Sequence, residues 1–505
     1  MGKKLIITIS VVLIVIIAGG IAAFMLLGNK NSEEDEFLPT ANDFEADVEN
    51  LKSEKLTLCF YGQETPSSAE VLQAVNNRLK QEINAEIQFK FIFDRPENYL
   101  EKIKSDISAG LPCDAFYNFG VLPADLETLA NEGYIADLTE LFPKNAPNYY
   151  RQFSKDDIDA ASINGKLYAV PERVPHASRT CAIVRQDLLE KYGIPEIKSY
   201  YDYEFYLRTI KEKEPGLIPM NCFDTMLGLF ADAYGYVILD DELGLVYKWD
   251  DPNVKIQAWE QTPVFEECLN RIKSWRDMGY LTKNIGVAQL SVNMIASKKW
   301  ASFVGMLGEQ FNLTALNYKA YQLNDGYSVR LNPLRRGMAI NAKSANAERV
   351  FMFIDWLESS QENYDLYMYG VKGKHYIEKE DYIEPPEDAV EGDYFYYWFW
   401  TPPFRNIGYE RSNAPGMKEE MVQYYDIIRE KSKYPPLNGF TPDYSTVDSI
   451  MNARKLSYAD MDRSVYTGDY DESKVNAYIK SQKDAGIDNL ITEVQRQADQ
   501  FRAGQ

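Results

Sequence analysis

One apolar run near the N-terminus constrains this chain more than any other feature. Leu5–Leu27 is a run of 23 residues without a charged side chain. At about 1.5 Å of rise per residue, a helix of this length crosses a hydrocarbon core of about 30 Å. Lys3 and Lys4 precede the run, and an acidic cluster at 33–36 follows it. Because positive charge stays cytoplasmic, we expect the N-terminus inside the cell and the remaining chain outside.

The apolar run has two interpretations. An uncleaved helix makes residues 1–28 a single-pass anchor in the cell membrane, with an extracytoplasmic C-terminal domain. A secretory signal has a shorter apolar region of about 7–15 residues and a small-residue cleavage site. Gly20-Ile21-Ala22 is a weak match to such a site. We favour the anchor, and either interpretation exports the bulk of the protein.

The remaining chain is expected to contain a spacer and at least two lobes. Residues 29–53 are polar and acidic, with too few apolar side chains to pack, and they predict a linker from the membrane. The following ~450 residues exceed what one hydrophobic core organises. The formal net charge of −22 argues against nucleic acid and anionic lipid surfaces as partners, because both require clustered Lys or Arg.

Cysteine spacing argues against a disulfide scaffold or a zinc site. Five cysteines lie far apart, and none of them form a CxxC pair. The set is Cys59, Cys113, Cys181, Cys222 and Cys268. Several lie in apolar stretches, so we expect buried free thiols, with one bridge left open as an alternative. We expect no metal site.

Periodicity between residues 55 and 133 predicts alternating strands and helices. Strands are expected at 56–60, 87–93 and 115–117, and helices over the apolar stripes at 71–79 and 99–107 and over 122–132. Thr65-Pro66 is expected to provide the N-cap and first position of the first helix. This succession predicts a parallel sheet with right-handed crossovers.

Ligands of such sheets lie beyond the C-terminal ends of the strands. The candidate binding residues are therefore Tyr61 and Gln63 after the first strand, and Tyr117 and Asn118 after the third. Aromatic side chains can stack on a ligand ring, and amide side chains can hydrogen-bond its hydroxyls.

No catalytic motif is present. The chain has no GxSxG, HExxH or GxxxxGK[ST] sequence, and only two histidines, His176 and His375. With 76 acidic residues, some pair of carboxylates always has a spacing that suits glycoside hydrolysis, so that signal has no value without geometry. We expect no catalytic residues, no enzyme activity and no cofactor.

Aromatic content is the positive signal. The chain has 36 Tyr, 24 Phe and 7 Trp, and residues 394–400 are seven consecutive aromatics. Seven in a row cannot all point into a core from a strand or a helix, so some are expected to be exposed or to line a cleft. Aromatic faces pack on the apolar C–H faces of sugar rings, which makes Trp398 and Trp400 candidate sugar-binding residues.

Several segments, in order over residues 55–503, carry a family resemblance. They are Tyr99–Ile103, Ala109–Asp114, Gly133–Thr139, Asn164–Pro171, Arg185–Leu189, Asn341–Ser344, Glu362–Leu366 and Ala485–Asp488. Together they resemble family 1 of the extracellular solute-binding proteins of bacterial ABC importers, within the superfamily of maltose-binding protein. The likeness is greatest to a lipoprotein-like Gram-positive branch. This chain departs from that branch because no cysteine precedes Cys59, so the apolar helix must replace the lipid anchor.

The resemblance implies a periplasmic-binding-protein-like α/β fold with an N-terminal transmembrane helix. Two lobes, each with a central mostly parallel sheet flanked by helices, would close on a ligand like a hinge. The expected parts are lobe 1 at 54–170 and 337–402, lobe 2 at 171–336, and a helical segment at 403–505 packing mainly on lobe 2. Chain crossings are expected near Val170-Pro171, Arg336-Gly337 and Pro402-Pro403.

The resemblance also implies a function in transport. The chain would capture a small solute, with an oligosaccharide favoured, and deliver it as a monomer to the permease subunits of an ABC importer. Glu172 and Arg173, just past the first crossing, and Arg405 complete the candidate ligand-binding residues. A surface glycan hydrolase and a ligand-binding surface sensor remain alternative functions. The sequence does not distinguish an oligosaccharide from a monosaccharide or a peptide-like solute.

Overall fold

The structure is a computed structural model of the whole chain. It describes residues 50–504 except 96–97, 119–122, 175–176, 179, 223–225, 282–297, 307–316, 324–327, 390–393, 395–401, 414 and 468–469. The described residues fall within one compact unit. The expected membrane anchor and most of its acidic linker lie outside them. Among the described helices, none combines the length and apolar character that a membrane span requires.

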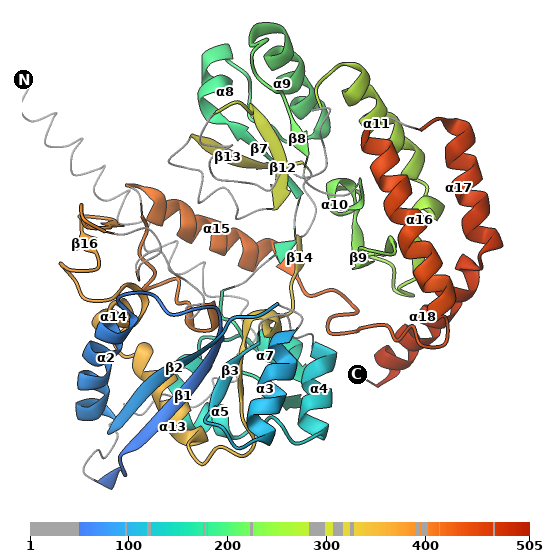
Figure 1. Cartoon of the computed structure of the whole chain (residues 1–505). Helices are drawn as coiled ribbons and strands as arrows, with labels where there is room; N and C mark the ends of the chain where they lie inside the picture. Colours follow the sequence, from blue (N-terminus) through green and yellow to red (C-terminus); the bar gives the residue numbers. More distant parts are fainter. Residues whose placement is uncertain are drawn as a thin grey trace, which may run out of the picture. The chain divides into compact units, whose positions relative to one another are not determined.

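The first sheet has the strand order β15-β3-β1-β2 (Figure 1). Its strands are β1 (Glu54–Tyr61), β2 (Ala85–Ile92), β3 (Ala115–Tyr117) and β15 (Met338–Ile340). β1 pairs in parallel with both β2 and β3, which confirms the parallel arrangement expected for the first three strands. β15 returns from far along the chain and pairs antiparallel to β3.

Helices alternate with these strands as the apolar spacing predicts. They are α2 (Ser68–Glu82), α3 (Tyr99–Ser108) and α4 (Pro123–Asn131). Val71, Val75 and Leu79 of α2 are fully buried against the sheet. The N-cap prediction was wrong: Ser67 caps α2, and the Thr65 and Ser68 hydroxyls lie 2.8 Å apart. The Ser68 backbone N also donates to Thr65 O at 3.1 Å, which closes a turn ahead of the helix, so the helix starts later than the Thr-Pro dipeptide suggested.

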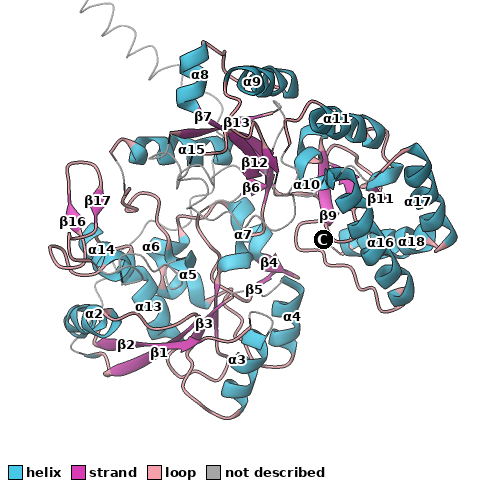
Figure 2. Ribbon diagram, turned by 45° about the horizontal axis from the view of Figure 1, so that its top comes forward, coloured by secondary structure: helices cyan, strands magenta, loops and turns pink. Residues whose placement is uncertain are grey.

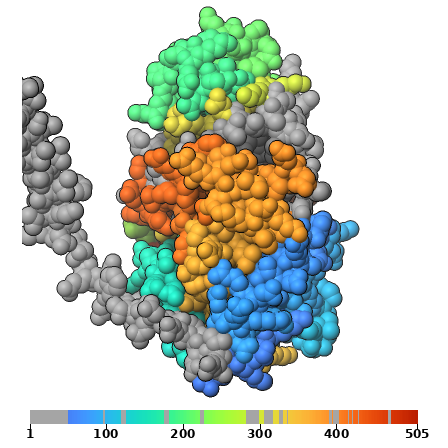
Figure 3. All heavy atoms as spheres, turned by 90° about the vertical axis from the view of Figure 1, so that its left-hand side faces the viewer, coloured from blue at the N-terminus to red at the C-terminus, as the bar shows by residue number. Residues whose placement is uncertain are grey.

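Later segments complete the first core. They include α5 (Leu141–Asn145), α6 (Pro147–Tyr150), α7 (Lys155–Ala161), α13 (Ala347–Leu357) and α14 (Gln361–Tyr369). Phe142 stacks on Phe351 with ring centroids 5.5 Å apart. Trp356 Nε1 donates to Glu82 at 2.6 Å. In Figure 3, residues near the N-terminus, in blue, lie directly against residues from later in the chain, in orange. Segments far apart in the sequence thus share the first core.

The second sheet has the order β13-β7-β12-β8. Its strands are β7 (Thr180–Arg185), β8 (Asn221–Cys222), β12 (Ser302–Met306) and β13 (Tyr318–Gln322). β7 is antiparallel to both neighbours, and only β12 and β8 pair in parallel. The expectation of a mostly parallel second sheet was therefore wrong. β7 carries the chain away from one connection and β13 leads back to another, so the two strands run in opposite directions.

Helices surround the second sheet, and a smaller sheet lies beside it (Figure 2). The helices are α8 (Gln186–Tyr192), α9 (Tyr200–Lys213), α10 (Met226–Phe230) and α11 (Phe265–Asp277). The smaller sheet contains β9 (Tyr236–Asp240), β10 (Leu245–Lys248) and β11 (Gln257–Ala258), followed by the 3₁₀ turn η4 (Trp259–Gln261). Gly193 ends α8 in the left-handed conformation at φ 61°, which glycine adopts without a side-chain clash.

Three segments connect the two large sheets and pair with one another. They are β6 (Ala177–Ser178), β14 (Ser328–Arg330) and β18 (Ser432–Lys433), in the order β18-β14-β6. We call these three strands the connections. Val170 N donates to Met338 O at 2.8 Å, so the first two expected crossing points lie side by side.

The third connection differs from the expected position at Pro402-Pro403. Those prolines belong to the 3₁₀ turn η8 (Pro402–Phe404), and Phe404 packs edge-on against Phe353 in the first core, with centroids 5.9 Å apart. The chain then forms α15 (Met417–Lys431) before it reaches β18. The apolar side chain of Phe404 thus keeps this segment on the first core.

Three helices end the chain: α16 (Asp448–Thr467), α17 (Glu472–Asp484) and α18 (Ile487–Ala503). Val465 of α16 is buried with the second sheet's helices, and Leu490 of α18 is buried with Leu245 of β10. Arg454 of α16 donates to both Glu260 oxygens, at 2.7 and 3.1 Å, and both side chains are fully buried. This ion pair fastens α16 to η4.

The cysteines whose surroundings are described are buried, as expected. They are Cys59, Cys113, Cys181 and Cys268. Cys59 and Cys113 lie close together, with their sulfur atoms 2.7 Å apart.

Candidate functional site

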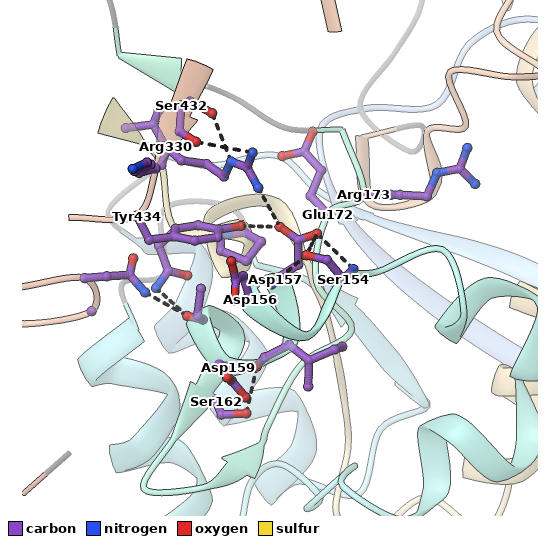
Figure 4. A pocket seen from close by; sticks show the side chains of 18 of the residues that line it. Ser154, Asp156, Asp157, Asp159, Ser162, Glu172, Arg173, Arg330, Ser432 and Tyr434 are labelled. Atoms are coloured by element: carbon purple, nitrogen blue, oxygen red, sulfur yellow. Dashed lines mark hydrogen bonds and ion pairs between the residues drawn. The ribbon is translucent and has the colours of Figure 1, made fainter. Parts of the chain in front are cut away.

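A cavity of about 2240 Å³ opens beside the three connections (Figure 4). Its wall combines α7, the 3₁₀ turn η6 (Pro333–Arg336), α15, the chain from β18 to Thr441, and the C-terminal end of α18. The hairpin of β4 (Ser162–Ile163) and β5 (Lys166–Leu167) also contributes. Because these segments come from distant parts of the sequence, the cavity exists only in the folded chain.

Asp157 of α7 joins three segments of the cavity wall. Its Oδ2 accepts hydrogen bonds from the Ser154 backbone N at 3.1 Å and the Ser154 hydroxyl at 2.7 Å. Its Oδ1 accepts from Arg330 Nη1 at 3.2 Å and from the Tyr434 hydroxyl at 2.8 Å (Figure 4). Arg330 lies in β14 and Tyr434 directly follows β18, so one carboxylate links α7 to the second and third connections.

Arg330 extends this network toward α15. Its Nε donates to the Ser432 hydroxyl and its Nη2 to the Arg429 carbonyl, both at 2.9 Å. Its guanidinium also lies over the Tyr434 ring, 5.2 Å from the centroid. Burial, together with the Asp157 carboxylate, raises the pKa of Tyr434, so its hydroxyl stays protonated and donates.

Two asparagine side chains also join α7 to the second and third connections. Asn332 Nδ2 and Asn438 Nδ2 both donate to the Ala160 carbonyl, at 3.1 and 3.0 Å. Asn332 follows the second connection and Asn438 follows the third. The C-terminal end of α7 is therefore held by both connections through one carbonyl oxygen.

Arg405 and α15 form another part of the wall. Arg405 Nη2 donates to Glu410 Oε1 at 2.5 Å and to the Tyr425 hydroxyl at 3.0 Å. Tyr425 packs edge-on against Tyr424, with centroids 5.0 Å apart, and burial raises the pKa of Tyr425. Apolar surface with a few placed polar groups is typical of small-molecule sites.

The charges that line the cavity nearly balance. Seven lining residues are acidic: Glu127, Asp156, Asp157, Asp159, Glu172, Glu410 and Glu430. Six are basic: Arg173, Arg330, Arg336, Arg405, Arg429 and Lys433. Three of the arginines already have a carboxylate partner within 3.2 Å, because Arg173 pairs with Glu358, Arg330 with Asp157 and Arg405 with Glu410. The wall therefore offers hydrogen bonds rather than a net positive field.

Over the described part of the chain, no group of three or more His, Cys, Asp or Glu side chains is placed to hold a metal ion.

Three of the residues expected from the sequence line the cavity: Glu172, Arg173 and Arg405. Glu172 is buried, and its backbone N donates to Pro333 O at 2.8 Å. Arg173 Nη1 donates to Glu358 Oε2 at 3.0 Å, and Nη2 donates to Asn406. Figure 4 shows the Arg173 side chain directed away from Asp157 and Tyr434. The charge of Arg173 therefore pairs with Glu358 within the protein.

The other expected residues lie elsewhere. Tyr61, Gln63, Tyr117 and Asn118 follow the ends of β1 and β3 as expected, but they are not among the residues that line this cavity. Asn118 is fully buried, and its Nδ2 donates to Leu334 O at 3.3 Å, so it holds η6 in place. Trp398 and Trp400 lie outside the described residues.

Sequence analysis missed most of the cavity wall. Asp157, Arg330, Tyr434, Asn438 and Phe440 lie in segments without a chemical motif. The one available signal was Ser154-x-x-Asp157, whose spacing matches a capping box and marks the start of α7. Nothing in the sequence pairs Asp157 with residues far along the chain.

Residues 62–364 match the family of bacterial extracellular solute-binding proteins, and residues 436–503 match a domain of unknown function, DUF3502. A carbohydrate ABC transporter substrate-binding protein of Streptococcus pneumoniae serotype 4 is 22% identical over 458 residues, covering 87% of this chain and 89% of that protein. The polygalacturonan/rhamnogalacturonan-binding protein YtcQ of Bacillus subtilis is 23% identical over 246 residues, 44% of this chain and 47% of its own length.

Solved structures share the fold. The N-glycan transport solute-binding protein NgtS from Streptococcus pneumoniae superposes with a TM-score of 0.70 at 20% identity, covering 89% of this chain and 99% of that one. An HMO-binding, ABC-transporter-associated solute-binding protein from Bifidobacterium longum infantis gives a TM-score of 0.60 at 14% identity, covering 89% of this chain and 99% of that chain. These likenesses establish the periplasmic-binding-protein-like α/β fold expected from the sequence.

Proposed function

Because the chain belongs to the bacterial extracellular solute-binding protein family, we propose that it captures an oligosaccharide outside the cell for an ABC importer. The relative from Streptococcus pneumoniae is a carbohydrate ABC transporter substrate-binding protein, and the match covers 89% of its length. Members of this family bind solutes rather than transform them. The observation that carries the proposal is the large cavity beside the three connections.

The proposed mechanism is closure of two lobes about the connections. One lobe contains the first sheet and the other contains the second sheet, with β6, β14 and β18 between them. A ligand that contacts both lobes binds the closed form more tightly, and that difference in affinity shifts the population toward closure. Residues 337–402 complete the first lobe in this proposal, and α16 to α18 pack on the second.

We propose a ligand without net charge. The lining carboxylates slightly outnumber the lining cations, and three of the arginines already pair with carboxylates. A polyuronate would need an excess of free cations to offset its charges. Sugar hydroxyls instead need placed donors and acceptors, each contributing about 0.5–1.5 kcal/mol net.

Among the sequence candidates, Glu172 and Arg405 are the proposed ligand contacts in this cavity. Trp398 and Trp400 remain proposed stacking residues, and Tyr61, Gln63, Tyr117, Asn118 and Arg173 remain proposals for the closed form. Leu5–Leu27 is the proposed anchor that holds a monomer at the membrane beside the permease subunits.

Isothermal titration of the full chain in detergent tests the proposal. The probes are Man5GlcNAc and kestose as neutral oligosaccharides, and an oligogalacturonate as a charged one. We expect a neutral probe to bind and to be recovered unchanged by mass spectrometry. Cleavage of the probe would favour the hydrolase alternative. Absence of binding by every neutral probe would contradict the proposal.

A further inference from the structure

The cavity wall includes part of the segment matched by the domain of unknown function. Asn438, Gly439, Phe440 and Thr441 line the cavity ahead of α16, and Gln500 and Phe501 line it at the end of α18. All of these residues lie within 436–503. The two stretches are far apart in sequence, so their meeting at one wall depends on how the segment folds.

Phe440 and Phe501 meet there as a pair of rings. Their centroids lie 5.4 Å apart, with an angle of 48° between the ring planes. Both side chains are half-buried and pack on a core that contains Leu437, Leu490 and Val494. One side of the pair is thus supported by apolar packing, while the same residues line the cavity.

A reciprocal hydrogen-bond pair fixes the two stretches. Gln497 Nε2 donates to Asp443 O at 2.7 Å, and Asp443 N donates to Gln497 Oε1 at 2.8 Å. Gly439 adopts a left-handed conformation at φ 81°, which turns the chain just before Phe440. Asn438 ties the same turn to α7 through Ala160. The rings are therefore positioned before any ligand arrives.

We infer that residues 436–503 supply a binding surface of the solute site, on which Phe440 and Phe501 stack against a sugar ring. This inference rests on the proposed function and assigns a role to the domain of unknown function. A sugar ring places apolar C–H groups on an aromatic face while its hydroxyls point outward. Thr441 and Gln500, beside the rings, are polar side chains that can meet such hydroxyls.

Titration of the full chain with Man5GlcNAc and kestose tests the inference. Phe440→Leu and Phe501→Leu keep an apolar side chain over the core but remove the flat ring, so the fold is retained. We expect each to weaken binding of the probe about tenfold, and Phe440→Tyr to bind within about threefold of the native chain. Phe205→Leu is the matched control, because Phe205 is exposed on α9 and is not among the residues that line the cavity.

The outcomes distinguish failure of the aromatic surface from failure of the proposed function. If the native chain binds a probe and both leucine variants bind it equally well, the aromatic surface is excluded while the proposed function stands. If the native chain binds neither probe, the proposed function fails and the assignment of the segment fails with it.

A separate observation concerns Cys59 and Cys113. Cys59 lies within β1, Cys113 precedes β3, and their sulfur atoms are 2.7 Å apart in the buried first core. We propose that this pair forms a disulfide in the exported protein, where the compartment is oxidising. Each thiol loses one proton and one electron, and the two electrons reduce the disulfide of an external thiol–disulfide oxidoreductase to a dithiol.

Thiol counting in the exported full chain tests this proposal. Denaturation in alkylating reagent without reductant should leave a Cys59–Cys113 cross-linked peptide and label the other three of the five cysteines. The Cys113→Ser variant should label all four that remain. Reductant should lower the Tm of the native chain but not that of the variant, because the bridge restrains the unfolded chain. Five labelled cysteines in the native chain would overturn the proposal.

Discussion

Arg330 Nη1 lies 3.2 Å from Asp157 Oδ1, which joins the second connection to helix α7 through one ion pair. Both side chains are largely buried, and the same oxygen accepts from Tyr434 after the third connection. The pair therefore links the second and third connections to a helix that lines the cavity.

Asp157→Asn should destabilise the fold by about 1–2 kcal/mol. The change removes the charge that pairs with Arg330 and weakens the capping box with Ser154. Urea unfolding followed by circular dichroism measures the loss. Asp156→Asn is the control, since Asp156 is exposed one position earlier and should stay within about 0.5 kcal/mol. Equal effects from both variants would contradict the role of Asp157.

Glu358 should make stability fall as the pH rises from about 4.5 to 7. Burial raises the pKa of Glu358 to about 7, although Arg173 favours the charged form. In the unfolded chain this carboxyl ionises near pH 4.3, so between the two values the folded state binds more protons and loses stability as pH rises. The full effect is about 4 kcal/mol, at 1.36 kcal/mol for each pH unit between about 4.3 and 7.

Glu358→Gln tests that dependence. Unfolding free energies at pH 5, 6 and 7 should fall less steeply for Glu358→Gln than for the native chain. Glu362→Gln, at an exposed position on α14, should keep the native slope. An unchanged slope in Glu358→Gln would assign the pH dependence to other groups.

Arg454→Met should cost about 3–5 kcal/mol, because it leaves the Glu260 carboxylate buried without its partner. The double variant Arg454→Met/Glu260→Leu should recover much of that loss, since both buried charges are then absent. Guanidinium unfolding provides the measurement. Lys455→Met is the adjacent control, because Lys455 forms an exposed pair with Glu242 and should change stability little. A loss in the double variant as large as in the single one would argue against this account.

Gly337→Ala should strain the contact between the first two crossing points. A Cβ atom at Gly337 would lie 2.3 Å from the Val170 carbonyl oxygen, which is a backbone atom and cannot rotate away. Relief requires the chain to move, so the midpoint of thermal unfolding should fall by several degrees. Gly216→Ala has open space around its Cβ and should leave the midpoint unchanged or raise it slightly. Similar midpoints for the two variants would refute the close approach.

The first sheet was predictable because its signals are local. Apolar spacing in α2 and α3 and alternation in β2 each lie within one element, and their succession predicts the parallel pairing that β1 adopts. The antiparallel β7 was not predictable, since its direction depends on where β13 returns to the connections.

Residues of the candidate site were predicted only where their position next to an expected crossing or an aromatic cluster was enough to identify them. Glu172 and Arg405 were found because they lie near expected crossings or aromatic clusters, and both line the cavity. Phe440, Phe501 and Tyr434 were not, because their neighbours come from segments that meet only after folding. The buried amide of Asn118 looked like a ligand contact from its place after β3, but it donates to Leu334 O.

The pairing of β6, β14 and β18 limits how this molecule can bend. Two bodies joined by one strand can swing and twist freely, whereas three strands hydrogen-bonded side by side must rotate together or lose those bonds. Bending is then confined to one direction across the ribbon. In the closure proposed above, the two faces of the cavity would therefore meet in the same relative position each time.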